Sequence, residues 1–554
     1  MTIKVQKQFG SYFDDWSESC SRLQHLLHCV IIVAMVGVVE FVAISTETTW
    51  DNVEPNRFSW TIFAYCLRFL SLLNLPMCVA SFLGLTMYDA FPDPVRLRAD
   101  PDSLPFVVVR IVTRGDFPDL VRQNSLANLR VCKETGLRHY SIEVVTKKSV
   151  QLPKMVHLRE VVVPDFYEPS SGSMYKARQL QYCLEDGINE LGDEDWILHL
   201  DEDSVLTPDA VKGMMNFIHD GEAHFGTGLV VTTRGPVSNW MTTLADLIKA
   251  ADDMGRTRFL LKAFRKPWFG FKGSFLLANA KAERIVSFDN GPVGSMTEDA
   301  YFAMKGIQEG FRFGFIEGEV LEQSPCTLGD FLRQRKRWMQ GLTLTVSCPK
   351  VITVHTSDCI GYHIRDNHDF LEIHSLEDED LADDILFIVA IDSTHLIEWT
   401  VLQVPRPDSR NFQVDLHYWR TKIWLTIFYL SWLLTPLILL NGLFSKFPDP
   451  TPGIFKSIFT FNIAISTYYY LYGTLKNEKY LGMARSFLIL LCLPLVIPFC
   501  SLLETASVVY SWFGHTNDFY VVKKVTRVLS SSSSACLSSS PSARCWRPQA
   551  SCIP

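Results

Sequence analysis

The chain has 554 residues, a formal net charge of −8 and 47% hydrophobic residues, which is enough material for one large or two medium-sized domains. The acidic balance, without a basic patch, excludes a nucleic acid as the expected partner. The 14 cysteines form no CxxC pair and no metal-like spacing, so we expect reduced structural thiols.

Five apolar stretches have the length of a membrane-spanning helix, because a hydrocarbon core of ~30 Å requires ~20 residues. They comprise residues 23–45, 60–88, 423–444, 454–475 and 487–512. We predict two transmembrane helices in residues 23–88 and about three transmembrane or re-entrant helices in residues 423–512, where Pro494 and Pro498 allow a kink. Buried helices of a soluble core are the alternative, although uncharged runs of about 18 residues are uncommon there.

The charges around the first stretch indicate its orientation. The segment before it carries Lys4, Lys7 and Arg22. The loop after it carries Glu47, Asp51 and Glu54. The positive-inside rule therefore places residues 1–22 and, after the second helix, the long middle region on the cytosolic side.

The middle region alternates between strand and helix patterns. The strand patterns are FVVVRIVTRGD from Phe106, YSIEVVTKK from Tyr140, LREVVVPD from Leu158 and DWILHLDED from Asp195. Helical periodicity separates them, at residues 120–136 and 174–191. This alternation predicts an α/β domain with a mainly parallel, Rossmann-like sheet.

Polar residues follow three of these strands. They are Thr113, Arg114 and Asp116 after the first, Thr146 and Lys147 after the second, and Asp201, Glu202 and Asp203 after the last. Ligands of open α/β sheets bind at the carboxyl ends of the strands. The convergence of polar residues at these ends predicts a nucleotide site.

Three adjacent carboxylates repel one another, so Asp201, Glu202 and Asp203 require a functional explanation. They either hold a hard divalent cation or form a general acid–base pair. We favour Mg²⁺ or Mn²⁺ on Asp201 and Asp203, because in an extended chain these side chains point to one side and Glu202 points away. A helix N-cap explains them less well, since Thr207 and Pro208 already begin the next helix.

Two further motifs lie downstream. Glu298 and Asp299 open a predicted helix, where acids either act in a site or complement the helix dipole. The segment FLRQRKRWMQG contains Gln334, Arg337 and Trp338. Its arginines could bind a diphosphate while the tryptophan stacks on a sugar, or the helix could present a basic surface to lipid headgroups.

Taken in order, DxD at Asp201, ED at Glu298 and QxxRW at Gln334 resemble the motifs of the membrane-bound family 2 glycosyltransferases, which have a GT-A fold. The resemblance covers about residues 105–345. The segment YKARQL is similar to the part of these enzymes near the donor nucleotide, and FGFKGSFLL looks like their acceptor segment.

Other segments resemble the egghead-type β-1,4-mannosyltransferases, among them VTRGDFPDLV, QLQYCLEDG, NWMTTLAD, SFDNGPVGSMTED and FIEGE. This resemblance implies transfer of mannose from GDP-mannose to glucosylceramide, with inversion at the anomeric carbon. It also implies an integral membrane protein of the endoplasmic reticulum or Golgi whose catalytic domain faces the cytosol.

The resemblance assigns roles to the motif residues. Asp299 would be the base that deprotonates the acceptor hydroxyl, and Asp201 and Asp203 would hold the metal. The expected donor contacts are Thr113, Arg114, Asp116, Lys176, Asp201, Asp203, Gln334, Arg337 and Trp338. The expected acceptor contacts are Gly273, Ser274, Glu298 and Trp338.

Two segments depart from the family pattern. Residues 348–415 are rich in Asp, Glu and His, and represent either a genuine insertion or an intron read through in the gene prediction. The histidines in this segment lack convincing metal-ligand spacing; they are His355, His363, His368 and His374. The Ser-rich residues 528–554 are expected to be disordered.

Three alternative functions remain at this level: a ceramide glucosyltransferase that uses UDP-glucose, a processive polysaccharide synthase, and an inactive membrane scaffold. A processive synthase would need more spans after the QxxRW motif to conduct its polymer. A scaffold would have no reason to keep Asp201, Asp203, Asp299 and Arg337 together.

Overall fold

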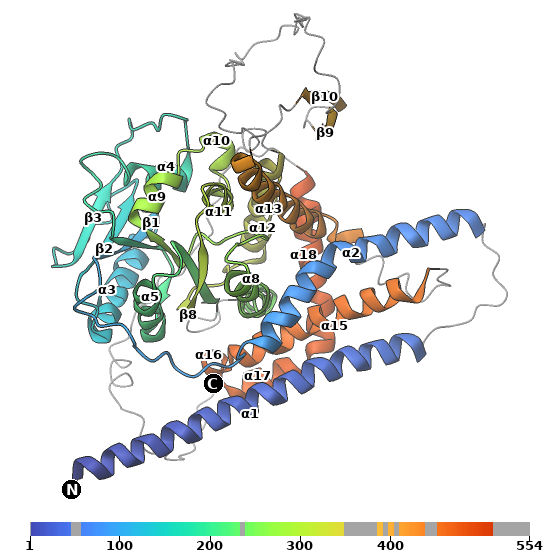
Figure 1. The fold of residues 1–554 in the computed structure, drawn as a ribbon, viewed down its shortest axis with the longest axis horizontal. Helices are drawn as coiled ribbons and strands as arrows, with labels where there is room; N and C mark the ends of the chain where they lie inside the picture. Colours follow the sequence, from blue (N-terminus) through green and yellow to red (C-terminus); the bar gives the residue numbers. More distant parts are fainter. Residues whose placement is uncertain are drawn as a thin grey trace, which may run out of the picture.

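The computed structural model describes residues 2–45, 57–232, 239–347, 385–391, 397–403, 409–437 and 451–513. Figure 1 shows an α/β domain and, beside it, a group of long helices that extends away from the sheet. The predicted α/β catalytic domain flanked by membrane helices is confirmed.

The α/β domain contains an eight-stranded sheet with the order β3-β2-β1-β4-β7-β6-β8-β5. Its strands are β1 (Val107–Thr113), β2 (Tyr140–Thr146), β3 (Leu158–Val162), β4 (Trp196–Asp201), β5 (Val205–Leu206), β6 (Phe225–Val231), β7 (Leu276–Asn279) and β8 (Phe313–Leu321). The strands β1 to β4 pair in parallel, as do β6 and β8. Strand β7 is antiparallel to β4 and β6, and β5 is antiparallel to β8, so the sheet is mainly but not wholly parallel.

Helices cover both faces of this sheet, which explains why β1 is apolar apart from Arg110 and the terminal Thr113. One face packs against α3 (Pro118–Thr135) and α5 (Pro208–Asp220). The other packs against α4 (Tyr175–Tyr182), α9 (Ala280–Val286) and α11 (Glu298–Gln308). The side chains of β1 alternate between these cores: Ile111 belongs to the first, and Val112 to the second.

Helix α4 is shorter than the predicted helix 174–191 and ends at Tyr182. The backbone N–H groups of Cys183, Leu184 and Glu185 each bond three residues back, which tightens the last turn. Gly187 then adopts a φ of +80°, outside the right-handed helical region. The helical prediction was therefore wrong beyond this turn.

Further helices connect the two halves of the molecule. Between β6 and β7 lie α6 (Trp240–Asp246), α7 (Ile248–Asp252), the π-helix η1 (Asp253–Thr257) and α8 (Arg258–Ala263). Helix α10 (Gly291–Gly294) precedes α11, and α12 (Leu328–Ser347) follows β8. The C-terminal helices are α13 (Ser409–Leu433), α15 (Gly453–Lys476), α16 (Glu478–Leu481), α17 (Met483–Leu491) and α18 (Leu493–Trp512).

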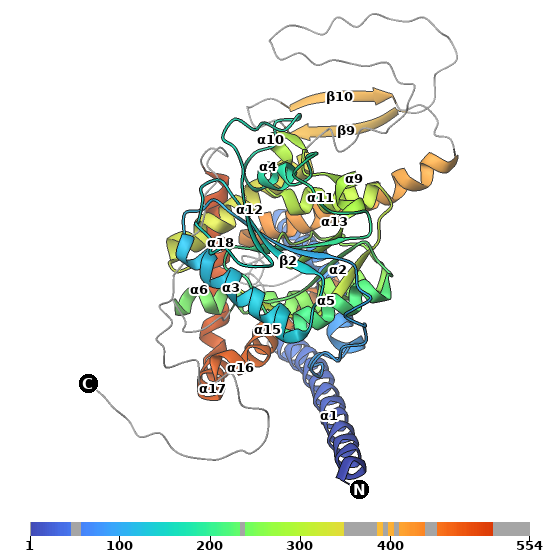
Figure 2. The same ribbon diagram turned by 90° about the vertical axis from the view of Figure 1, so that its left-hand side faces the viewer.

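Strands β9 (Ile385–Ile391) and β10 (Ile397–Gln403) form a separate antiparallel pair outside the large sheet (Figure 2). The rest of the stretch 348–408, and all of residues 528–554, lie outside the described residues. The predictions for the insertion and the tail are therefore not decided by the structure.

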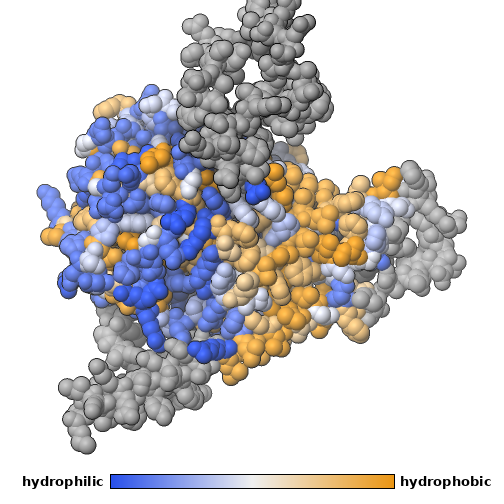
Figure 3. Space-filling model, viewed as in Figure 1, coloured by the Kyte–Doolittle hydropathy of each residue, from blue (hydrophilic) through white to orange (hydrophobic). Residues whose placement is uncertain are grey.

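Three helices in the described part of the chain are long and apolar enough to cross a membrane: Arg22–Ala43 in α1 (Thr2–Ser45), Thr61–Met87 in α2 (Arg57–Met87), and Leu493–Trp512. Apolar side chains gather over this helical region in Figure 3, whereas the surface of the α/β domain is mostly hydrophilic. These helices indicate that the protein associates with a membrane.

The two other predicted spans have different outcomes. Residues 454–475 form most of α15, which packs between α1 and α2 and is long enough to span a membrane but less apolar than the three candidate spans. Residues 423–444 run partly outside the described residues. The predicted stretch 487–512 is divided at Cys492 into α17 and α18, in keeping with the expected irregularity.

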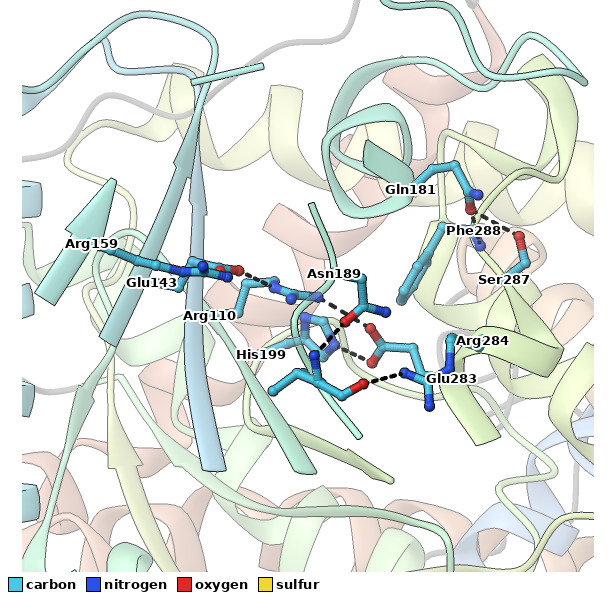
Figure 4. Close-up of polar contacts among 11 residues, drawn as sticks. Arg110, Glu143, Arg159, Gln181, Asn189, His199, Glu283, Arg284, Ser287 and Phe288 are labelled. Atoms are coloured by element: carbon cyan, nitrogen blue, oxygen red, sulfur yellow. Dashed lines mark hydrogen bonds and ion pairs between the residues drawn. The ribbon is translucent and has the colours of Figure 1, made fainter. Parts of the chain in front are cut away.

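A buried ion-pair network crosses the sheet on the side of α9 (Figure 4). The Arg110 guanidinium donates to Glu143 at 2.6 Å and contacts Glu283 at 3.3 Å. Glu283 also contacts His199 at 2.6 Å, while Arg159 bonds the other side of Glu143. These contacts join β1, β2, β3, β4 and α9, so the network ties the parallel half of the sheet to its covering helix.

Candidate active site

The site residues come together at a cavity of about 840 Å³ beside the carboxyl ends of β1 and β4. Of the residues predicted from the sequence, those that line it are Thr113, Arg114, Lys176, Asp201, Asp203, Gly273, Ser274, Glu298, Asp299, Gln334, Arg337 and Trp338. Asp116 does not line the cavity. It forms ion pairs with Arg114 and Lys148, both at 3.2 Å.

The three adjacent acids all line the cavity, but they do not alternate as an extended strand would. Strand β4 ends at Asp201, and Glu202 and Asp203 form a turn. The side chain of Glu202 accepts a hydrogen bond from the Thr113 hydroxyl, and Asp203 accepts one from the Gln323 backbone N–H at 3.2 Å. The expectation that the Glu202 side chain faces away from those of Asp201 and Asp203 assumed an extended chain, and the turn at Glu202 and Asp203 removes that premise.

Buried amides hold this turn in place. The Asn124 side chain of α3 donates to the carbonyl of Glu202 at 2.7 Å, and Asn128 donates to the carbonyl of Ser204 at 3.2 Å. On the other side, the hydroxyls of Ser204 and Ser274 are 2.9 Å apart. Helix α3 on one side and the segment that carries Ser274 on the other thus fix the acids relative to the cavity.

Lys176 is the central cation of the site. Its Nζ lies 2.7 Å from Asp201 and 3.5 Å from Glu298, and it donates to the carbonyl of Gly273 at 3.0 Å. Burial alone would lower the pKa of Lys176, but the carboxylates of Asp201 and Glu298 raise the pKa above its ordinary value, so the lysine stays charged. A Cβ at Gly273 would lie 3.1 Å from both Lys176 Nζ and Glu298 Oε1, which explains the small residue at this position.

Asp299 has a carboxyl group whose pKa lies near neutrality. It begins α11 beside Glu298, and its Oδ1 accepts from the Ala300 N–H at 2.8 Å. Burial, with the adjacent charge of Glu298, raises the pKa of Asp299 to about 7, although Lys176 opposes this shift. A carboxyl with a pKa near neutrality can accept a proton from a substrate hydroxyl and release it again at physiological pH.

Helix α12 brings the third motif to the cavity. Gln334, Arg337 and Trp338 line it, and Gln334 Oε1 has no hydrogen-bond partner among the described residues. Burial lowers the pKa of Arg337, while the carboxylates of Glu298, Asp201 and Asp299 counteract this; a guanidinium remains charged in any case.

Arg335, on the same helix, has a structural role. It pairs with Asp246 of α6 at 2.9 Å and with Glu504 of α18 at 3.0 Å. Its buried guanidinium therefore connects the motif helix to a candidate membrane helix. Arg335 therefore does not contribute to a basic surface for lipid headgroups.

One wall of the cavity was missed by the sequence analysis. It consists of Lys249, Asp252, Asp253 and Arg256 from α7 and η1, together with Lys272, whose Nζ contacts Asp253 at 2.7 Å. The sequence does show clustered charge here, in Asp252, Asp253 and Arg256. Nothing in it, however, places these residues near β4. A π-helix inside a helical segment is frequent at functional sites, and here it forms part of the cavity.

The acids at the end of β4 fit a cation that is shared with a substrate. The described residues contain no group of three His, Cys, Asp or Glu side chains able to hold a metal by themselves. Mg²⁺ is often bound by one or two carboxylates together with substrate phosphates and water. Asp201, 46% exposed and 2.7 Å from Lys176, and the buried Asp203 suit such a shared site.

The comparisons with known proteins agree with this geometry. The family described as glycosyl transferase family group 2 matches residues 196–497, which include β4, α11 and α12. β-1,4-Mannosyltransferase egh of Drosophila melanogaster is 37% identical over 522 residues, covering 92% of this chain and 99% of its own. The chain belongs to the β-1,4-mannosyltransferases of this family.

Two further relatives carry the same description. β-1,4-Mannosyltransferase bre-3 of Caenorhabditis briggsae is 38% identical over 91% of this chain and 98% of its own, and that of Caenorhabditis elegans is 37% identical over the same shares. Among solved structures, Staphylococcus aureus TarS residues 1–349 matches 45% of this chain and 66% of its own, with 13% identity and a TM-score of 0.27, which is too low to carry an argument. The β-1,4-mannosyltransferase assignment therefore comes from the sequence relatives.

Proposed function

We propose that this β-1,4-mannosyltransferase transfers mannose from GDP-mannose to glucosylceramide in a single inverting displacement. The observation that carries the proposal is the arrangement around Asp299: one carboxyl with a pKa of about 7 lines the same cavity as Lys176 and Arg337. Such a cavity offers a base for the attacking hydroxyl and cations for the departing diphosphate.

The reaction requires few groups. Asp299 removes the proton from the acceptor hydroxyl as its oxygen attacks the anomeric carbon, and the bond to the diphosphate breaks on the opposite face. A single inverting displacement uses one base, whereas a double displacement needs a second carboxylate as nucleophile. The positive charges of Lys176 and Arg337 favour the diphosphate as its negative charge grows.

Asp201 and Asp203 would hold Mg²⁺ or Mn²⁺ together with the donor diphosphate. A divalent cation bound there would neutralise charge on the leaving group. Lys176 contacts Asp201 directly, so it would keep this carboxylate oriented toward the phosphates. Glu202, held by Thr113, would position the turn without serving as a ligand.

The cavity lies next to candidate membrane helices, where the lipid part of the acceptor would be. The cavity wall formed by η1 packs against the candidate membrane helix in α2, and α13 contributes Phe428 and Trp432. A glycolipid whose ceramide stays in the bilayer could therefore present its sugar to the cavity. We further propose that the domain faces the cytosol at the endoplasmic reticulum or Golgi, as the positive-inside rule predicts.

The test is a transfer assay in microsomes that contain the full chain. GDP-mannose, UDP-glucose and UDP-GlcNAc are each supplied with fluorescent glucosylceramide, and product is separated by chromatography. We expect mannosylated product with GDP-mannose alone, and a loss of at least 10²-fold in kcat for Asp299→Asn. Transfer from UDP-glucose in place of GDP-mannose would overturn the donor assignment, and full activity of Asp299→Asn would overturn the base assignment.

A further inference from the structure

An aromatic row lines the part of the cavity next to α13. Phe269 and Phe428 have ring centroids 6.4 Å apart, Phe428 and Trp432 are 6.0 Å apart, and Trp432 and Trp338 are 6.4 Å apart. All four rings line the cavity. Rings from the β6–β7 region, α12 and α13 thus form one continuous apolar surface.

Asp252 stands beside this aromatic row. The Arg256 guanidinium lies 5.5 Å from the Phe269 ring centroid and 5.1 Å from that of Phe428, and its Nε donates to Asp252 at 2.7 Å. The side chain of Arg256 is 10% exposed, whereas that of Asp252 is 32% exposed. The Arg256 guanidinium thus bonds both oxygens of Asp252, through Nε and Nη2. Because each carboxylate oxygen can accept more than one hydrogen bond and the side chain is partly exposed at the cavity, Asp252 can still accept one from a ligand.

The neighbouring Asp253 is more deeply buried than Asp252. Its side chain is 6% exposed, it contacts Lys272 at 2.7 Å, and it accepts from the Val230 N–H at 3.0 Å. A carboxylate has about four acceptor positions. The two contacts of Asp253 both go to its Oδ2, and its side chain is nearly buried, so a ligand in the cavity can reach it less easily than the 32% exposed Asp252.

The wall that carries Asp252 is held firmly. Asp252 ends α7 directly before η1, and a Cβ on Gly84 of α2 would come within 2.0 Å of the carbonyl oxygen of Gly255. This contact requires glycine at Gly84, so the π-helix rests directly on the backbone of a candidate membrane helix. A rigid wall keeps a binding carboxylate in one position.

We propose that Asp252 and the aromatic row form the subsite that binds the acceptor sugar, with Asp252 accepting a hydrogen bond from one sugar hydroxyl. A pyranose has an apolar C–H face, which suits aromatic rings, and a rim of hydroxyls, which suits a carboxylate. This inference rests on the proposed function, because it takes the acceptor to be a sugar on a membrane lipid. Asp252 is then a specificity residue, distinct from the base Asp299.

The experiment is a thermodynamic cycle that combines one enzyme variant with acceptors lacking one hydroxyl each. Wild type and Asp252→Asn are assayed in microsomes with short-chain glucosylceramide and its 2-, 3- and 6-deoxy analogues, all of which keep the attacking 4-hydroxyl. We expect Asp252→Asn to raise the acceptor KM by roughly 10–100-fold, the effect of losing a charged hydrogen bond, and to leave the GDP-mannose KM unchanged. One deoxy analogue should show the same loss with wild type and no additional loss with the variant.

Two matched variants complete the design. Asp119→Asn removes a carboxylate that also pairs with an arginine on a helix, but outside this cavity, and should leave the acceptor KM unchanged. Asp252→Glu keeps the charge and should recover part of the acceptor binding. Equal losses for every analogue, or a change confined to the GDP-mannose KM, would overturn the subsite.

A failure of the proposed function would look different. If wild type used another nucleotide sugar, the same cycle run with that donor would still test Asp252. An acceptor KM that is unchanged in Asp252→Asn, with an active wild type, would overturn the inference about the subsite alone.

Discussion

At the scale of single residues, the proposed base Asp299 should set the pH dependence of the transfer. Burial and Glu298 raise the pKa of this carboxyl to about 7, and only its deprotonated form can act as a base. We expect kcat/KM to rise about tenfold per pH unit below pH 7 and to level off above it. A profile measured from pH 5 to pH 9, flat through neutrality, would contradict the role of Asp299.

The same shift has a consequence for stability. The folded-state pKa of Asp299 is higher than the ordinary value of an aspartate, so the group favours the folded state at low pH, and this contribution is lost as the pH rises through about 7. Above that pH the folded protein contains a poorly compensated buried charge. We expect Asp299→Asn to raise the unfolding temperature at pH 8 and to change it less at pH 5, as thermal unfolding in detergent would show.

At the scale of elements, the buried ion pairs hold the parallel half of the sheet. Arg110 and Glu143 are each 1% exposed, and removing one partner leaves an uncompensated buried charge. We expect Glu143→Gln to destabilise the protein by about 3–5 kcal/mol. Thermal unfolding of the purified variant provides the measurement.

An exposed pair is the matched control for this prediction. Arg98 and Asp220 lie 2.5 Å apart with side chains 62% and 39% exposed. Pairs of this kind contribute about 0–1 kcal/mol, so Asp220→Asn should change the unfolding temperature little. If the two variants lowered the unfolding temperature equally, burial would not be the reason why the Arg110–Glu143 pair stabilises the sheet.

At the scale of the whole molecule, a contact between two glycines couples the membrane helices to the cavity. A Cβ at Gly84 of α2 would overlap the backbone of Gly255 in η1, so Gly84→Ala must displace the wall that carries Asp252. We expect this variant to lower both the unfolding temperature and kcat/KM for the glycolipid. Gly37→Ala in α1, where a Cβ meets nothing within 4 Å, should leave both unchanged.

The sequence by itself determined the class of the protein and predicted most residues of the candidate site. Strand patterns predicted β1 to β4. The adjacent carboxylates were identified because like charges side by side cost stability unless they have a function, and the ED pair with Gln334, Arg337 and Trp338 was identified by its resemblance to the family motifs. These signals are local, since they depend on residues close together along the chain.

Only the tertiary structure decided the rest. The turn after Asp201 brought Glu202 into the site, and β7 entered the sheet in the antiparallel direction, because strand pairing and turns depend on distant hydrogen-bond partners such as Asn124. The wall with Asp252 could not be predicted for the same reason: its place at the cavity depends on η1 resting against α2, a contact between segments about 170 residues apart.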